Sequence, residues 1–461
     1  SQSRCILTWS DCLPGTPVAG SASPTSPRGT RTPKRAEAAI IGRKRLVARQ
    51  REMQYNAGVL KTFDEIIVNS VDRQVEVRDM SMIEVKINRK TGELSVWNDG
   101  PGIEPVPHKS GKGLVPEVAF GEFMASTNFD DNTRKRFTGG RFGVGAKATN
   151  AWSKSFCVRT FHGKSGLFYE QTWSDNMVRP APRAPRPEPG AARMALRTRS
   201  RGRQETKSAP VVEDQGKQKQ GWTHITWTPG ESSSRPFAST ARAQCRQVPH
   251  HPTSDRAPSA ETGARADYKR FGMSRGLDAD TYACMQMRVY DLCACTRESI
   301  KVTLNGTPLP FKSLTGYANL FWGNEGELGA RDRVYFKLAD SASAAKIEVM
   351  ISVSGSAALE ARGLVNGVLC SQGTHIEHII SKLADGLVAR AVRQQKRDKM
   401  KTDETKTGLN KMKTYFRQHM GIIAVALLPN PRFDGQTKEK LTLHPKDWGF
   451  DATIDDKLVD K

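Results

Sequence analysis

Thr138-Gly-Gly-Arg-Phe-Gly-Val-Gly-Ala-Lys147 is the stretch that says most about the fold of this 461-residue chain. Glycines at this density let backbone N–H groups approach an anion, because no Cβ stands in the way. The residues that follow, as far as Trp152, suit a helix whose N-terminus would add a favourable dipole for phosphate. The order of residues matches neither the Walker pattern GxxxxGKS/T nor the dinucleotide pattern GxGxxG. Taken alone, the stretch fits either a phosphate loop of another class or a structural turn.

A helical pattern upstream of this loop places two oxygen-bearing side chains on one face. Apolar residues recur at helical spacing at Leu60, Phe63, Ile66, Ile67 and Val71. Glu65 and Asn69 are four residues apart and therefore lie on the same side of the predicted helix. A carboxylate and an amide oxygen so placed can converge on a water molecule and a Mg²⁺ ion. The same pair would also occur on the solvent-exposed side of an ordinary helix.

Two further pieces complete a candidate nucleotide site. Residues 84–88 and 93–97 alternate like paired strands, and Asn98-Asp-Gly-Pro-Gly102 then forms a tight turn that exposes a side chain able to bond an adenine amino group. Far downstream, Gln436-Thr-Lys438 offers a lysine that could reach a terminal phosphate. The helix, the turn, the glycine-rich loop and the lysine, in this order, together indicate a nucleoside triphosphate site.

Nine motifs of the chain resemble successive motifs of eukaryotic-type type II DNA topoisomerases. They are Phe63-Asp-Glu-Ile-Ile-Val-Asn69, Val96-Trp-Asn-Asp-Gly-Pro-Gly-Ile103, Val115-Pro-Glu-Val-Ala-Phe-Gly121, Ser126-Thr-Asn-Phe-Asp-Asp131, the Thr138 to Lys147 loop, Gln171-Thr-Trp-Ser-Asp-Asn-Met177, Arg288-Val-Tyr-Asp-Leu292, Leu364-Val-Asn366 and Phe433-Asp-Gly-Gln-Thr-Lys-Glu439. The resemblance implies an α+β fold: an ATPase sandwich of the gyrase, chaperone and histidine-kinase type, followed by a smaller α/β transducer domain. It also implies ATP and Mg²⁺ as cofactors, DNA as a partner, a homodimer in the intact enzyme and a nuclear location, with a DNA-containing organelle as the alternative.

The same resemblance assigns roles to individual residues. Glu65 would be the general base for the attacking water, Asn69 the Mg²⁺ ligand and Lys438 the sensor of the γ-phosphate. Asn98 would bind adenine, while Ser126, Thr127 and Asn128 would contact the sugar and phosphates. The remaining nucleotide contacts would come from Gly140, Arg141, Phe142, Gly143, Val144, Gly145, Ala146, Lys147, Gln436 and Thr437.

Composition divides the chain into ordered and low-complexity parts. Residues 1–35 predict a disordered tail, and residues 36–230 predict the ATPase domain with a Pro- and Arg-rich insertion at 179–220. A second polar insertion is expected at 231–266, with the transducer domain at 267–461. Within the later half, residues 282–293 and 375–400 suit helices, and the apolar run at 421–428 suits a buried strand.

The net charge of +23 and the pI near 9.8 point to a polyanionic partner, unless basic low-complexity segments account for the total. Eight cysteines without a CxxC pair predict reduced thiols, and the longest apolar run is too short for a membrane helix. His375 and His378 have metal-compatible spacing but no third ligand nearby, so zinc is not expected. The basic run from Lys396 to Lys413 fits a DNA contact or a solvated helix and loop equally well.

The sequence departs from the family pattern ahead of Tyr55, at Arg73 and in the two insertions at 179–220 and 231–266. In the family, an N-terminal strap crosses to the partner subunit. No counterpart of this segment precedes Tyr55, so nucleotide-driven dimerisation is not predicted for this sequence. Arg73 stands where the family commonly has an amide residue. The sequence contains no candidate for the DNA-cleaving tyrosine, so the expected activity is ATP hydrolysis alone. The alternatives are a catalytically impaired copy that binds DNA through its basic surface, and another ATPase of the superfamily, of mismatch-repair or chaperone type.

Overall fold

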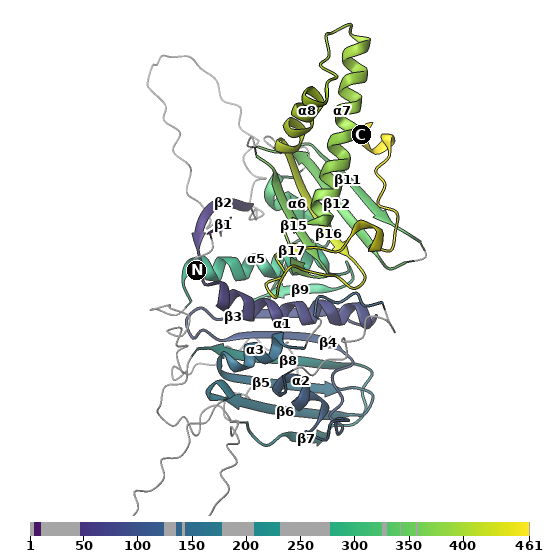
Figure 1. Ribbon diagram of the computed structural model, residues 1–461. Helices are drawn as coiled ribbons and strands as arrows, with labels where there is room; N and C mark the ends of the chain where they lie inside the picture. Colours follow the sequence, from purple (N-terminus) through teal and green to yellow (C-terminus); the bar gives the residue numbers. More distant parts are fainter. Residues whose placement is uncertain are drawn as a thin grey trace, which may run out of the picture.

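The computed structural model describes residues 4–10, 47–123, 135–140, 143–177, 207–230, 277–324, 330–341, 343–355 and 358–460. These residues form two α/β units, one built on an eight-stranded sheet and the other on a five-stranded sheet (Figure 1). Helix α1 (Ala57–Glu76) runs between the two sheets (Figure 1). The predicted α+β class is therefore confirmed.

The sheet of the first unit has the strand order β10-β9-β3-β4-β8-β5-β6-β7. Its pairs are antiparallel except for β3 with β9, which is parallel. The predicted hairpin corresponds to β3 and β4. The bounds are β3 Met82–Ile87, β4 Leu94–Gly100, β5 Ser153–His162, β6 Leu167–Ser174, β7 Val211–Asp214, β8 Gly221–Pro229, β9 Lys301–Leu304 and β10 Thr307–Pro308.

Helices cover this sheet and bring the site residues to its face. The side chain of Asn56 caps α1 by accepting a hydrogen bond from Val59 N at 3.0 Å. One face of α1 packs Phe63, Ile66 and Ile67 into the core with no exposed surface. The other helices of this unit are α2 (Val115–Gly121), α3 (Gly145–Ala151) and α5 (Ala279–Cys295), with a 3₁₀ turn η1 at Asp175–Met177.

The second unit is built on a sheet with the order β11-β12-β16-β13-β14, in which β13 and β16 are parallel. The predicted long helix is α7, and the predicted buried strand is β16. The strands are β11 Arg333–Ala339, β12 Lys346–Val353, β13 Glu360–Val365, β14 Val368–Leu369 and β16 Met420–Leu427, with a parallel pair of β15 Gln372–Gly373 and β17 Lys440–Leu441. The helices are α6 Leu314–Trp322, α7 Thr374–Arg397, α8 Lys406–Gln418, η3 Pro445–Asp447 and α9 Asp456–Asp460.

The first unit continues beyond residue 267, where the sequence predicts the start of the transducer domain. Strand β9 pairs in parallel with β3, with Lys301 opposite Met82 and Leu304 opposite Val85. Val302 and Leu304 lie in the same buried cluster as Val85. A strand from the later half of the sequence therefore extends the first sheet, and only this long-range pairing assigns it there.

The N-terminal part also departs from expectation. Residues 4–10, within the predicted tail, form strand β1 (Arg4–Ser10), which pairs antiparallel with β2 (Val47–Gln54). The apolar residues Ile6, Leu7 and Trp9 favour a strand, a preference that the Ser- and Pro-rich surroundings mask in the sequence. Residues 11–35 of the predicted tail, and the predicted insertion at 231–266, lie outside the described residues.

The end of the predicted insertion at 179–220 is likewise ordered into the sheet. Strand β7 pairs with β6, with Val212 opposite Tyr169, and Gln171 Nε2 donates to Ser208 O at 2.9 Å. Lys207 Nζ lies 2.9 Å from Glu117 Oε1, and this contact outweighs the burial of Glu117 and lowers its pKa. Strand β7 is the edge strand of the sheet, and its residues are exposed while its backbone is paired with β6.

Replacing residues 207–220 by a Gly/Ser loop of equal length should therefore destabilise the protein. Equal length holds the closure entropy constant, so the loss reflects the pairing of β7 and the side-chain contacts of the segment, such as Lys207 with Glu117. A few net backbone hydrogen bonds amount to about 1–3 kcal/mol, or a fall in Tm of roughly 2–10 °C. Thermal unfolding followed by circular dichroism measures the fall in Tm. An unchanged Tm would show that the segment is a dispensable insertion.

Candidate functional site

A cleft of about 1240 Å³ lies between the two units, and most of the predicted site residues line it. Both domains contribute to it. The predicted residues in its wall are Glu65, Asn69, Asn98, Gly140, Gly143, Val144, Gly145, Ala146, Lys147, Gln436, Thr437 and Lys438. Ser126, Thr127, Asn128, Arg141 and Phe142 lie outside the described residues.

Lysines from both domains contact the carboxylate of Glu65 within this cleft. Lys61, one turn earlier on α1, places Nζ 2.8 Å from Glu65 Oε1. Lys438, from the loop before β17, places Nζ 3.3 Å from Oε1 and 3.4 Å from Oε2. Lys438 has a φ of 61°, a left-handed conformation that costs a non-glycine residue energy. The loop therefore holds a strained backbone where it presents this side chain to the other domain.

Asp72 anchors the glycine-rich loop to α1. Its carboxylate accepts hydrogen bonds from Gly139 N at 2.7 Å and from Gly140 N at 3.0 Å. Burial raises the pKa of Asp72 to about 7, although both N–H donors favour the charged form. Asp72 is not among the site residues that the sequence predicts. Its position seven residues after Glu65, hence on the same helix face, is the signal that could have identified it.

The start of helix α3 comes so close to Glu65 that a side chain at Gly145 would displace the carboxylate. A Cβ built on Gly145 would lie 2.2 Å from Glu65 Oε2, far inside contact distance. The N-terminus of α3 therefore borders the carboxylate directly. Lys147, two residues further along the same helix, is buried, and burial lowers its pKa to about 8.

Gly145→Ala should for this reason impair the site without unfolding the protein. The added methyl group must push α3 or the Glu65 side chain aside, and small displacements of reacting groups are costly. We expect the turnover of ATP, the substrate that the sequence predicts, to fall by about tenfold or more. Steady-state turnover and Tm should be measured together. Normal turnover would show that Glu65 and α3 do not need this close approach.

Asn98 of β4 also lines the cleft, together with Thr223, its partner on β8, and Ile225. Its Nδ2 donates to Asp99 O at 2.9 Å. The Asp99 carboxylate is itself occupied, because it accepts from Ser81 N at 2.9 Å and from Met82 N at 2.8 Å. Asp99 thus fixes the end of strand β4. Asn98 is a polar side chain in the wall of the cleft.

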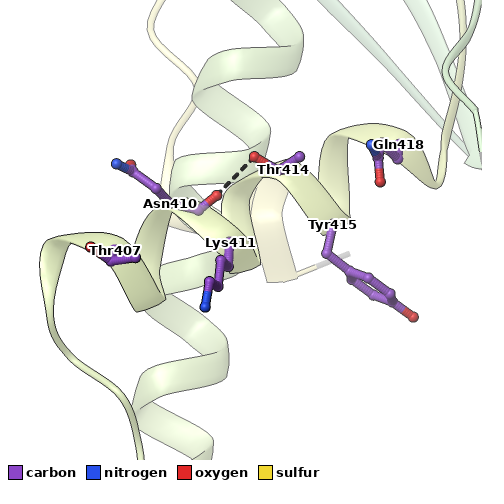
Figure 2. A pocket seen from close by; sticks show the side chains of 6 residues that line it. All are labelled: Thr407, Asn410, Lys411, Thr414, Tyr415 and Gln418. Atoms are coloured by element: carbon purple, nitrogen blue, oxygen red, sulfur yellow. Dashed lines mark hydrogen bonds between the residues drawn. The ribbon is translucent and has the colours of Figure 1, made fainter.

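A second, shallow hollow lies on the outer face of α8 and has a different character. Figure 2 shows Tyr415 and Lys411 projecting from the helix and Thr414 bonded to Asn410 O, at 2.9 Å, along it. None of the described residues that line this hollow is a carboxylate, a cysteine or a histidine, so the cleft is the stronger candidate site.

Several basic residues near this hollow are paired with carboxylates. The pairs are Lys396 with Glu404 at 2.9 Å, Lys413 with Asp385 at 2.6 Å and Arg417 with Glu377 at 2.7 Å. Part of the basic run from Lys396 to Lys413 is therefore neutralised within the fold.

Proteins of known function and solved structures resemble this chain over most of its length. The family of DNA gyrase B matches residues 317–460. DNA topoisomerase 2 of Arabidopsis thaliana is 29% identical over 416 residues, which cover 89% of this chain and 22% of that protein. The ATPase and transducer domains of DNA topoisomerase II from Balamuthia mandrillaris share 27% identity and superpose with a TM-score of 0.66, over 90% of this chain and 84% of that one. The ATPase region of Saccharomyces cerevisiae topoisomerase II gives 25% identity and a TM-score of 0.64, over 90% and 85%.

The chain is similar to the ATPase region of type II DNA topoisomerases. It spans about a fifth of the length of the full-length relatives that it matches. The predicted resemblance is therefore confirmed, both for the ATPase fold and for the transducer fold that follows it.

Two histidines and one arginine of this topoisomerase-like chain have partners within the fold. His375 is fully buried and its Nε2 lies 2.9 Å from Cys370 O, while His378 Nε2 lies 3.2 Å from Ala452 O, so each ring is engaged by a backbone carbonyl. Arg73 places Nη1 3.0 Å from Glu76 Oε2 at the rim of the cleft.

Among the helices in the described ranges, none combines the length and the hydropathy that crossing a bilayer requires.

Proposed function

We propose that this chain binds and hydrolyses ATP in the cleft between its two domains, as the ATP-driven part of a type II DNA topoisomerase. The observation that carries the proposal is the contact between Glu65 of the first domain and Lys438 of the second, 3.3 Å apart in a cleft lined by the glycine-rich loop. A carboxylate and an ammonium group so placed supply a base and a cation for phosphoryl transfer.

In the proposed mechanism the chain positions and neutralises the triphosphate rather than reacting with it. A γ-phosphate entering the cleft competes with Glu65 for Lys438, which frees one side of the carboxylate for a water molecule. Glu65 then accepts a proton from that water molecule while the oxygen of the water attacks the γ-phosphorus. ADP leaves as the bond to the γ-phosphate breaks. Lys438 offsets the charge that develops on the phosphate oxygens.

The other predicted residues complete the proposed binding site. Asn98 bonds the adenine amino group, and Gly140 to Lys147 surround the triphosphate together with Gln436 and Thr437. Ser126, Thr127, Asn128, Arg141 and Phe142 are proposed as further nucleotide contacts on the resemblance alone.

The oxygen donors beside the phosphate loop fit Mg²⁺. A Cβ built on Gly140 would lie 3.3 Å from Asp72 Oδ2 and 3.7 Å from Asn69 Oδ1, so both oxygens flank the loop. Hard oxygen donors of this kind suit Mg²⁺, which in such sites is held by few protein groups and by phosphate. Within the described ranges no three His, Cys, Asp or Glu side chains gather into a metal site, so an ion here would depend on the nucleotide. When bound, Mg²⁺ would neutralise phosphate charge, with Asn69 as its proposed protein ligand.

We also propose DNA as the partner, passage of one duplex through another as the process that ATP turnover drives, homodimerisation in the intact enzyme and a nuclear location. The net charge of +23 favours a polyanionic partner. The names of the relatives support the same reading.

Steady-state ATP hydrolysis with and without duplex DNA tests the proposal. DNA-stimulated turnover is the expected result. Turnover that ignores DNA would favour another ATPase of the superfamily, of mismatch-repair or chaperone type. Nucleotide binding with no turnover would favour a catalytically impaired copy.

A further inference from the structure

A buried chain of alternating charges connects the two domains behind the cleft. Arg288 of α5 donates from Nε and Nη2 to Asp64 Oδ1 of α1, at 2.8 and 2.6 Å, and from Nη1 to Asp291 Oδ2 at 2.8 Å. Arg362 of β13 completes the chain by donating from Nε to Asp291 Oδ1 at 3.2 Å. Tyr317 OH of α6 also donates to Asp291 Oδ1. The charges therefore run from the residue next to Glu65 to strand β13 of the transducer sheet.

These charges are withdrawn from water. The exposed fraction is 0% for the Asp291 side chain, 4% for Arg288 and 9% for Arg362. Burial by itself would raise the pKa of Asp64 and Asp291, yet Arg288 and Arg362 hold both pKa values below the ordinary value. Desolvating such groups costs several kcal/mol per ion, so a buried network is weak evidence for stability and better evidence for fixing one arrangement of the parts.

Arg288 also holds the backbone of the transducer. Its Nη2 donates to Gly367 O at 2.9 Å, in the turn between β13 and β14. Gly367 has a φ of 79°, and a Cβ built there would lie 2.8 Å from Val71 Cγ1, so the turn rests against α1. The preceding carbonyl, Asn366 O, would lie 2.9 Å from a Cβ built on Gly139. This turn of the transducer therefore touches both the helix that carries Glu65 and the first part of the glycine-rich loop.

We propose that Arg288 is a positioning residue, which ties the transducer turn at residues 366–368 to Asp64 and thereby sets the place of Glu65 in the cleft. This link is separate from the Lys438 loop, so the second domain acts on the site at two points. Movement of strand β13 relative to α1 shifts the base through Arg288. The part of the proposal that concerns turnover rests on the proposed role of Glu65.

Asp64→Asn tests the link from the ATPase side, because it keeps the shape of the side chain and removes the charge that holds Arg288. Asp64 also lies 3.4 Å from Lys61 Nζ, so the variant acts on Glu65 through Arg288 and through Lys61. We expect kcat to fall by about tenfold while the affinity for a non-hydrolysable ATP analogue stays within about twofold, since Asp64 is not among the described residues that line the cleft. The matched control is Glu360→Gln, which removes an ion pair with Arg331, at 2.7 Å, from the first residue of β13. An unchanged kcat, or an equal loss of analogue affinity, would overturn the proposal.

Gly367→Ala tests the link from the transducer side and needs no turnover. Its methyl group must displace the turn from Val71, so amide hydrogen exchange in the middle of α1 should accelerate by about tenfold, as ~1.4 kcal/mol of lost local stability produces. Glu360→Gln should leave that exchange unchanged. Exchange in α1 at the wild-type rate in Gly367→Ala would refute the link even if Glu65 proves to be the base. Accelerated exchange together with a fully active Glu65→Gln variant would instead refute the proposed role of Glu65 and leave the link standing.

Discussion

Glu65→Gln should bind ATP almost as the wild type does and hydrolyse it about 10²–10⁴-fold more slowly, the usual cost of losing a general base. The amide keeps the size of the side chain and can still accept a hydrogen bond from Lys61 or Lys438, which lie 2.8 and 3.3 Å from Glu65 Oε1. It cannot take the proton of the attacking water. Steady-state hydrolysis and equilibrium binding of an ATP analogue measure the two halves of the prediction.

The control for this variant is Glu84→Gln, on strand β3. Glu84 pairs with Lys86 at 3.0 Å and is not among the described residues that line the cleft. Its loss should leave turnover at the wild-type level. If Glu65→Gln retains near-normal turnover, Glu65 is not the base and another group must activate the water.

Lys438→Ala should weaken the binding of a non-hydrolysable ATP analogue much more than the binding of ADP. Only the triphosphate reaches far enough to lose the charge-assisted contact from the second domain. Such a contact contributes roughly 1.5–3 kcal/mol, which is about ten- to a hundredfold in affinity. Titration calorimetry with the analogue and with ADP gives the comparison.

The same variant should uncouple the two domains. Small-angle scattering should show the wild type becoming more compact with the analogue but not with ADP, and Lys438→Ala becoming more compact with neither. Lys440→Ala, two residues along and outside the wall of the cleft, is the matched control and should behave as the wild type does. Equal losses of affinity for ADP and the analogue would place Lys438 away from the γ-phosphate and remove the main support for the proposed coupling.

The helices and strands that carry the site follow from the sequence, because local periodicity encodes them. The apolar spacing from Leu60 to Val71 predicts a helix, and α1 extends over Ala57–Glu76. The alternation before Asn98 predicts the hairpin formed by β3 and β4. The glycine-rich loop, Glu65, Asn69 and Lys438 are likewise recognisable from the sequence alone, since each belongs to a motif of residues adjacent in the chain.

The tertiary structure decided everything that depends on residues far apart in the sequence. Lys438 reaches Glu65 across 373 positions, and Arg288 reaches Asp64 across 224. Asp72 has the sequence context of an ordinary helix residue, and only the packing of the glycine-rich loop onto it makes it part of the site. A local pattern shows which face of an element is apolar and must be buried, but the choice of partner depends on how all the buried faces pack together. For that reason the elements and most of the candidate site could be predicted from the sequence, whereas the charge chain between the domains could be seen only in the fold.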